Sequence, residues 1–396
     1  MDQEHIVKIV SDLIAINTVN PPGNEHLVLP IVKPLMEDLG MEVMTYEKES
    51  GRTNIVGKLG SGGKSVAFIS HMDTVPPGDR ELWDTDPFTP VVKDGKIFGR
   101  GALDDKGSFA ACYSACKAFI AENPNFGGTI YLVAAADEEL GSRLGVIYLM
   151  QDENFRVDAC IIPDGGEMDQ AVLGEKGILH LDVVSYGKQA HGSLPMLGKN
   201  AIEPLAALVS ELKHINLGED YDKQFDGWTM NVGVIQGGIA ANVVPARATL
   251  SIDFRFPTGI TKEDIIAQVQ EKIDLVKQRD PLARFEIKEA LSTKPHMITA
   301  DEPIVKSFEA ARKKLGLPMN YGTMGGNTVA KNFYDFGMTS IVHYPGDHRV
   351  AHVPNEFVPI DNMVQASILY AETLDAFFLG HTATSLEKQE DVVSVS

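Results

Sequence analysis

The sequence of 396 residues is poor in cysteine, in basic charge and in long apolar runs. Its three cysteines form no disulfide framework, so nothing demands an oxidising compartment, and we expect them to be small buried side chains. No apolar run approaches the ~20 residues that a membrane span needs. The first residues are acidic and amphipathic and lack the cationic start of a signal peptide, which predicts a cytoplasmic protein without a membrane partner.

Basic residues are the second shortage, because 35 Lys and Arg stand against 55 Asp and Glu, for a formal charge of −20. A general binder of nucleic acid or of anionic membranes needs a basic face, so this balance argues against both partners. An anionic substrate must then be drawn in by a local positive group, and a bound metal ion supplies one. The 44% hydrophobic content is that of an ordinary globular protein, and the length allows two or more domains.

Short apolar runs alternate with helical patterns in the two flanks of the chain. The runs predicted as buried strands are residues 65–70, 128–136, 159–163 and 340–345. Apolar strands that alternate with amphipathic helices indicate an α/β domain with a mixed, largely parallel sheet flanked by helices. We expect this domain to comprise residues 1–175 and 295–396.

The middle of the chain has a different pattern. Strand, helix, strand, strand, helix and strand are predicted over residues 178–187, 200–215, 229–236, 248–256, 262–278 and 284–290. This β-α-β-β-α-β order is the ferredoxin-like split arrangement. It predicts a compact α+β domain over residues 176–294, inserted between the two parts of the α/β domain.

Polar side chains directly follow three of the predicted strands. In open α/β sheets, ligands bind beyond the carboxyl ends of the strands, so groups at these positions are expected to converge. The segments concerned are His71-Met72-Asp73, Asp137-Glu138-Glu139 and Asp164-Gly165-Gly166. Asp104 and Asp105 add further acidic groups from a glycine-punctuated turn. Burying such carboxylates without a cation is costly, and histidine with several Asp and Glu suits a divalent metal ion.

Each motif also has a simple structural alternative. A lone His at a strand end is commonly a surface or capping residue, paired Glu is commonly a solvated face, and Asp-Gly is commonly a turn. The glycine spacing from Gly99 to Gly107 lacks the Lys-Ser/Thr of a P-loop and is weak evidence for phosphate binding. The joint occurrence of these motifs after successive strands favours the metal site.

These residues resemble the signature of the M20 metallopeptidases. That family includes acetylornithine deacetylase, succinyl-diaminopimelate desuccinylase, aminoacylases, carboxypeptidases and dipeptidases. The matching segments, which span nearly the whole chain, are His71 to Pro76, Trp83, Asp86 to Phe88, Gly95, Gly99 to Gly107, Asp137 to Glu139, Asp164, Ala190 to Ser193 and His352. The first domain would then be catalytic, and the inserted domain a lid and dimerisation domain.

The resemblance implies a site for two divalent metal ions, with zinc the usual occupant and cobalt or manganese as alternatives. Asp104 would bridge the two ions. His71 and Asp164 would complete the coordination of one ion. Glu139 and His352 would complete that of the other. Two such ions can share a hydroxide and polarise a carbonyl.

The resemblance also implies three residues that act beside the ions. Asp73 would accept the imidazole N–H of His71 and fix its tautomer. Glu138 would be the general base and then the proton donor to the leaving amine. His191, in the inserted domain, would reach across a dimer interface to stabilise the oxyanion, which makes a homodimer the expected assembly.

Substrate-binding residues are implied in the inserted domain and in a glycine-rich loop, namely Asn242, Arg255, Gly326 and Asn327. Arg255 could hold a substrate carboxylate bidentately, although a structural salt bridge is at least an equal alternative. Asp105 stands where many deacylases have methionine, and Asn327-Thr328 replaces the more usual Thr-Asp or Ser-Asp. Both departures weaken any transfer of substrate identity.

The resemblance implies a metal-dependent hydrolase of C–N amide bonds. Its expected substrates are small molecules, either N-acyl amino acids or short peptides. The leading hypothesis is a deacetylase or desuccinylase that uses a metal-bound hydroxide with Glu138 as base. The alternative is a metallo-carboxypeptidase or dipeptidase, because both reactions hydrolyse an amide next to a carboxylate. A metal-free binding protein of this fold would lack a ligand or Glu138, and the chain retains all of them.

Overall fold

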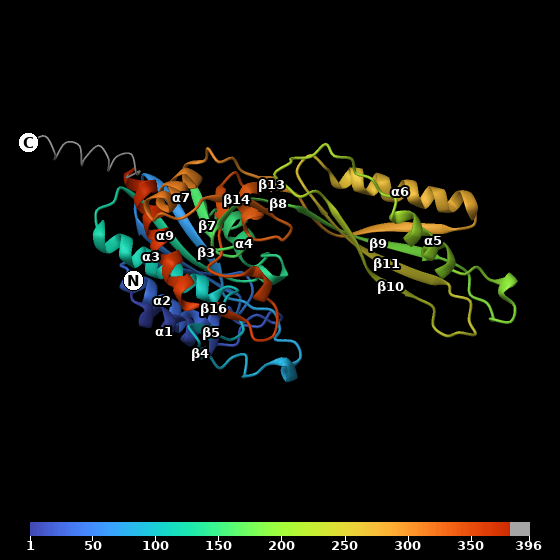
Figure 1. The fold of residues 1–396 in the computed structure, drawn as a ribbon. Helices are drawn as coiled ribbons and strands as arrows, with labels where there is room; N and C mark the ends of the chain where they lie inside the picture. The colour runs from blue at the N-terminus through green and yellow to red at the C-terminus, as the bar shows by residue number, and fades with distance from the viewer. Residues whose placement is uncertain (381–396) are drawn as a thin grey trace, which may run out of the picture. The chain divides into compact units, whose positions relative to one another are not determined.

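A computed structural model describes residues 1–380, and the tail at 381–396, whose polar composition predicts fraying, lies outside them. The chain falls into two units (Figure 1), which are described separately. Unit 1 contains Met1–Leu173, Ile298–Gly322 and the residues from Thr328 onward. Unit 2 contains Gly174–Met297 and Thr323–Asn327. The predicted boundaries, 1–175 with 295–396 and 176–294, stay a prediction.

Unit 1 is built on a mixed sheet in the strand order β1-β2-β6-β3-β7-β15-β8. The central pairs, β6 with β3, β3 with β7 and β7 with β15, are parallel, and the outer pairs are antiparallel. β14 also pairs with β8. The bounds are β1 Glu42–Glu47, β2 Thr53–Gly60, β3 Lys64–His71, β6 Gly128–Ala135, β7 Ala159–Ile162, β8 Gln170–Glu175, β14 Asn320–Met324 and β15 Thr339–Val342. The predicted largely parallel sheet is confirmed.

Helices flank this sheet, as the sequence predicts. α3 packs against β3 and α9, and α9 in turn packs against α7 (Figure 1). Cys112 and Cys116 on α3 and Cys160 on β7 are buried free thiols, which agrees with their expected role as small apolar side chains. The bounds are α1 Gln3–Ile14, α2 Leu29–Asp38, α3 Lys106–Glu122, α4 Val146–Gln151, α7 Pro303–Lys314, α8 Ala330–Asp335 and α9 Ile360–Leu379.

A second, small sheet in unit 1 has the order β16-β5-β4. It is formed by β4 Val91–Lys93, β5 Lys96–Phe98 and β16 Phe357–Pro359. Phe98 pairs with Phe357 in an antiparallel register, and their rings lie 5.3 Å apart between centroids. This pairing places the glycine-punctuated turn at 99–107 beside the chain that precedes β16.

Unit 2 has the predicted ferredoxin-like order. Its four antiparallel strands lie in the order β10-β11-β9-β12, and α5 and α6 pack together on one face (Figure 1). Alternate residues of β9 and β11, such as Leu181 and Ile252, are buried against these helices. The bounds are β9 Gly177–Tyr186, α5 Ile202–Leu212, β10 Thr229–Gly237, β11 Arg247–Phe256, α6 Lys262–Arg279 and β12 Arg284–Thr293. A further strand, β13 His296–Met297, lies outside this sheet and pairs with Gly174 and Glu175 at the end of β8.

Single 3-10 turns complete the described structure at Glu25–Val28, Arg80–Leu82, Glu138–Leu140, Pro195–Leu197 and His348–Val350. Within residues 1–380, no helix combines the length and the apolar character that a membrane crossing requires.

Candidate metal centre

Three adjacent parallel strands end at one edge of the sheet of unit 1. His71 is the last residue of β3, the central strand of the three. β6 ends at Ala135, and the 3-10 turn with Glu138 and Glu139 follows it. β7 ends at Ile162, two residues before Asp164. The parallel register therefore brings the predicted polar segments together, as expected of a ligand site in an open sheet.

The candidate ligand atoms form two overlapping groups. One oxygen or nitrogen atom each from His71, Asp104 and Glu139 lies within 4.8 Å of the others. The same limit holds for His71, Glu138 and Asp164. Nε2 of His71 is 3.9 Å from Oδ1 of Asp164. His71 thus belongs to both groups.

Asp104 lies between two imidazole rings. Its Oδ1 is 2.9 Å from Nε2 of His71, and its Oδ2 is 3.0 Å from Nε2 of His352. The same nitrogen of His352 is 3.2 Å from Oε2 of Glu139. The two oxygens of one carboxylate therefore face different histidines, which is the arrangement that a bridging metal ligand requires.

The charge balance of the cluster fits cationic occupants. Burial raises the pKa values of Glu138 and Asp164 well above the usual range, and burial also raises the pKa of Glu139. Hydrogen bonds to Asp104 and Glu139 raise the pKa of His352 to about 10. Carboxylates gathered at this density need positive charge between them, and imidazole nitrogen with carboxylate oxygen is a donor set suited to zinc, cobalt or manganese. The residues fit a divalent metal centre.

His71 is oriented through its second ring nitrogen. Nδ1 lies 2.9 Å from the backbone oxygen of Asp73 and 3.5 Å from Oδ1 of the same residue. Burial alone would lower the pKa of His71, but the hydrogen bonds to Asp104 and Asp73 raise it well above the usual value. A proton on Nδ1 that is donated to Asp73 leaves Nε2 as the atom that faces Asp104.

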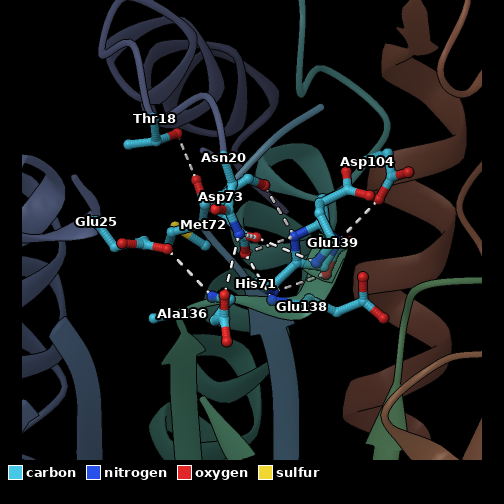
Figure 2. A network of polar contacts seen from close by, with 12 residues as sticks. Thr18, Asn20, Glu25, His71, Met72, Asp73, Asp104, Ala136, Glu138 and Glu139 are labelled. Atoms are coloured by element: carbon cyan, nitrogen blue, oxygen red, sulfur yellow. Dashed lines mark hydrogen bonds and ion pairs between the residues drawn. The ribbon is translucent and has the colours of Figure 1, made fainter. Parts of the chain in front are cut away.

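The carboxylate of Asp73 fixes the turn that carries Glu138 and Glu139 (Figure 2). It accepts the backbone N–H of Glu138 at 3.0 Å and that of Glu139 at 3.1 Å. Nδ2 of Asn20 donates to the same carboxylate at 2.8 Å. One fully buried side chain after β3 thereby sets the backbone of the turn after β6.

A buried ion-pair network behind this turn was not predicted from the sequence. Nη2 of Arg52 lies 2.8 Å from Oε1 of Glu25 and 2.9 Å from Oδ1 of Asp137. Oε1 of Glu25 also accepts the backbone N–H of Asp137 at 3.1 Å. Asn20, which donates to both Asp73 and Asp137, lies in the Asn-Pro-Pro-Gly break after α1.

Asp105, which stands where many deacylases have methionine, lies next to the candidate metal ligands. Asp105 is fully buried, and its Oδ2 accepts the backbone N–H of His71 at 3.2 Å. The side chain is therefore enclosed beneath the end of β3, which it supports. Nζ of the adjacent Lys106 donates to the backbone oxygen of Ile16 at 2.8 Å, and burial lowers the pKa of Lys106 to about 7.

The remaining predicted residues belong to unit 2, whereas the candidate ligands belong to unit 1. His191 and Asn242 are both exposed. Their segments lie side by side, because the N–H of Gly192 donates to the backbone oxygen of Asn242 at 2.7 Å. Nδ1 of His191 lies 2.7 Å from Oγ of Ser193 and 3.1 Å from the backbone nitrogen of the same residue.

Arg255 forms the salt bridge that the sequence left as an alternative. Its Nε lies 2.9 Å from Oδ1 of Asp253, and its Nη2 lies 3.2 Å from Oδ2. Its Nη1 donates to the backbone oxygen of Gly325 at 3.2 Å. Gly326 and Asn327 follow in that loop, and Asn327 is exposed.

The model of the family described as peptidase family M20/M25/M40 matches residues 67–376. Succinyl-diaminopimelate desuccinylase from Bordetella parapertussis is 29% identical over 389 residues, which are 96% of this chain and 100% of that protein. The same enzyme from Nitrosomonas eutropha is 31% identical over 335 residues, which are 82% of this chain and 86% of that protein.

Solved structures with this fold include a tripeptidase from Staphylococcus aureus, with a TM-score of 0.77 and 25% identity over 95% of this chain and 99% of that one. An M20 family metallo-carboxypeptidase from Sulfolobus solfataricus has a TM-score of 0.76 and 20% identity, over 96% of this chain and 100% of that one.

The fold and the metal-ligand cluster define a metal-dependent hydrolase of amide bonds. The chain belongs to peptidase family M20/M25/M40. The predicted family, fold class and enzyme class are therefore confirmed.

Proposed function

We propose that the protein removes the acyl group from N-acyl amino acids, as a deacetylase or desuccinylase does, at a centre of two divalent ions. Zinc is the first expectation, and cobalt and manganese are the alternatives. The observation that carries the proposal is Asp104, whose two oxygens lie 2.9 and 3.0 Å from the imidazoles of His71 and His352. Desuccinylase relatives at 29% identity over nearly the full lengths support an acyl substrate.

Five side chains would hold the ions. Asp104 would bridge them, and His71 with Asp164 would hold one of the two. Glu139 and His352 would hold the other. Bound ions would polarise the scissile carbonyl and lower the pKa of a water molecule toward neutrality.

Glu138 is the proposed general base. Asp73 fixes the backbone of Glu138. The carboxylate of Glu138 belongs to the same group of candidate ligand atoms as His71 and Asp164. Because burial raises its pKa, the carboxyl group can take a proton from the attacking water and later return it to the leaving amine. Asp73 would position this turn and His71 together.

His191 would stabilise the oxyanion through Nε2–H, contributed by unit 2 of a second copy of the chain. β10 is an edge strand of the four-stranded sheet, which supports a homodimer formed through unit 2. Ile235 on this strand is 53% exposed, and Ile239 and Met196 in nearby turns are 80% and 74% exposed. Apolar side chains at an unpaired strand edge favour association between copies.

Asn242, Arg255, Gly326 and Asn327 are the proposed substrate-binding residues. Asp253 accepts hydrogen bonds from Nε and Nη2 of Arg255. Nη1, the nitrogen nearest Gly325, is therefore the one available to a substrate carboxylate. The contact between Arg255 and the backbone oxygen of Gly325 supports a subsite that combines the arginine with the glycine-rich loop. We place the reaction in the cytoplasm, where three buried free thiols stay reduced.

A peptidase is the second candidate, favoured by the fold match to a tripeptidase at 25% identity. An assay of N-acetyl and N-succinyl amino acids beside dipeptides and tripeptides, with added zinc or cobalt, separates the two. We expect turnover of the acyl amino acids, and turnover of peptides alone would overturn the deacylase proposal. Glu138→Ala, prepared in parallel, measures any contaminating activity.

A further inference from the structure

A loop acid outside the predicted ligand set holds the turn of Asp104. Glu356 is fully buried, four residues after His352. Its Oε1 accepts the backbone N–H of Leu103 at 2.9 Å and that of Asp104 at 3.1 Å. One carboxylate oxygen therefore fixes the backbone of the residue that faces both histidines.

The other carboxylate oxygen of Glu356 pairs with Nη1 of Arg100. Arg100 is only 1% exposed, and its guanidinium carbon lies 5.3 Å from the centre of the Trp83 ring. The backbone N–H of Arg100 donates to the oxygen of Pro87 at 2.8 Å. The ion pair is thus enclosed by the Trp83 and Asp86-Pro87-Phe88 segment of the sequence signature.

The backbone around Glu356 is bound to the same turn. The N–H of Gly99 donates to the oxygen of Glu356 at 3.0 Å, directly beside the pairing of β5 with β16. Oδ1 of Asn355 accepts the N–H of Asp84 at 2.8 Å. The chain that leads from His352 into β16 is therefore tied to the turn of Asp104 by side chain and backbone alike.

We propose that Glu356 is a positioning residue of the metal centre, which fixes Asp104 directly and the loop of His352 through its own backbone. The inference rests on the two-ion centre proposed above. His71 ends strand β3 and Asp164 follows β7, so the sheet holds both, whereas Asp104 and His352 lie on loops. The ion on the Glu139 and His352 side should therefore depend on Glu356 more strongly.

The test measures metal binding by the full chain in Glu356→Ala and Glu356→Gln. Zinc dissociation constants come from chelator competition, and ligand geometry comes from the visible absorption of the cobalt-loaded protein. We expect Glu356→Ala to weaken the ion on the Glu139 and His352 side about 10- to 100-fold and to change the cobalt spectrum. Glu356→Gln keeps an oxygen for the two N–H groups but loses the charge opposite Arg100, so its effect should be smaller. If the alanine variant fails to fold, the glutamine variant carries the test.

Asp158→Ala is the matched control. Asp158 accepts the N–H of Ser65 at 2.7 Å and its hydroxyl at 2.8 Å, which ties β3 to β7 at their amino ends, away from the ligands. This variant should lower the unfolding temperature and leave zinc affinity and the cobalt spectrum unchanged. Glu356 variants that behave in the same way would overturn the positioning role alone. A native chain that binds no zinc would overturn the proposed function as well.

Discussion

Single residues in this protein hold the backbone of other residues that carry the chemistry. The Asp73 carboxylate accepts the N–H groups of Glu138 and Glu139, and Glu356 does the same for Leu103 and Asp104. A carboxylate that accepts two backbone N–H groups is held without relying on a flexible side-chain partner. These bonds fix the backbone of the proposed base, Glu138, and of two candidate ligands, Asp104 and Glu139.

Replacing Glu138 with glutamine should separate metal binding from proton transfer. The five proposed ligands remain, so bound zinc should stay near the native amount. Turnover should fall by about 10²- to 10⁴-fold, because no carboxylate takes the proton of the attacking water. Metal analysis and steady-state kinetics on the same preparation check this, and a variant with native turnover would remove Glu138 from the role of base.

His343 gives a pH prediction away from the metal centre. It is fully buried, with Nδ1 2.8 Å from the hydroxyl of Tyr370 and Nε2 3.1 Å from the oxygen of Met168. Burial lowers the pKa of His343 to about 4, so between that pH and its ordinary value of 6.5 the unfolded chain binds the extra proton. Protonation of this histidine in the unfolded chain should therefore lower the free energy of unfolding by about 2 kcal/mol as the pH falls from 7 to 5.

Urea unfolding of the native chain and of His343→Gln, both with chelator present, measures the contribution of this histidine. The native chain should lose more stability than the variant over this interval. Equal losses in the two proteins would contradict a neutral, buried His343.

Among the helices and strands, those with a local sequence pattern could be predicted. The apolar runs before His71, Glu138 and Asp164 are continuous in the sequence, and the strands β3, β6 and β7 were found there. The ferredoxin-like order of unit 2 was found for the same reason. The positions of polar residues after strand ends then located most of the site.

The elements that were missed depend on distant pairing. β5 and β16 have three residues each, and Phe98 meets Phe357 only through the tertiary fold. Glu356 resembles an ordinary loop acid in the sequence, and His352 was assigned by family resemblance alone. The Arg52 network was missed because no local pattern shows that a single arginine will be buried between two acids.

This network gives a prediction for the turn between β6 and α4. Arg52→Ala leaves Glu25 buried without its cation, and loss of one partner of such a pair costs about 3–5 kcal/mol. Asp137 loses its partner too, so the turn with Glu138 should loosen and kcat should fall. Urea unfolding and kinetics check both effects, and a loss below about 1 kcal/mol would contradict a structural role for the ion pair.

At the scale of the whole molecule, part of the excess of acidic residues belongs to the candidate metal centre. The formal charge of −20 argues against a binder of polyanions, and part of the acidic excess is gathered beyond the carboxyl ends of the central strands of unit 1. Cations bound there would reverse the local sign and allow a carboxylate-bearing substrate to approach. A strongly anionic chain can in this way act on an anionic substrate.

Mixing two inactive variants tests whether the site needs two copies of the chain. His191→Ala and Glu138→Ala should each have little activity alone. In a mixed dimer, one site combines an intact Glu138 with an intact His191 from the partner, so random mixing should restore about a quarter of native activity. Native mass spectrometry verifies the mixed species. If verified mixed dimers stay inactive, His191 does not act across an interface.

The proposed function requires a pair of metal ions held by strand-end and loop residues of unit 1. Anomalous diffraction recorded on both sides of the zinc absorption edge, from crystals grown with zinc, measures it most directly. We expect two peaks about 3.5–4 Å apart, on either side of the Asp104 carboxylate. One peak should touch His71 and Asp164, and the other Glu139 and His352. No zinc peak at Asp104, or peaks bound only by other residues, would contradict a two-ion centre held by these five side chains.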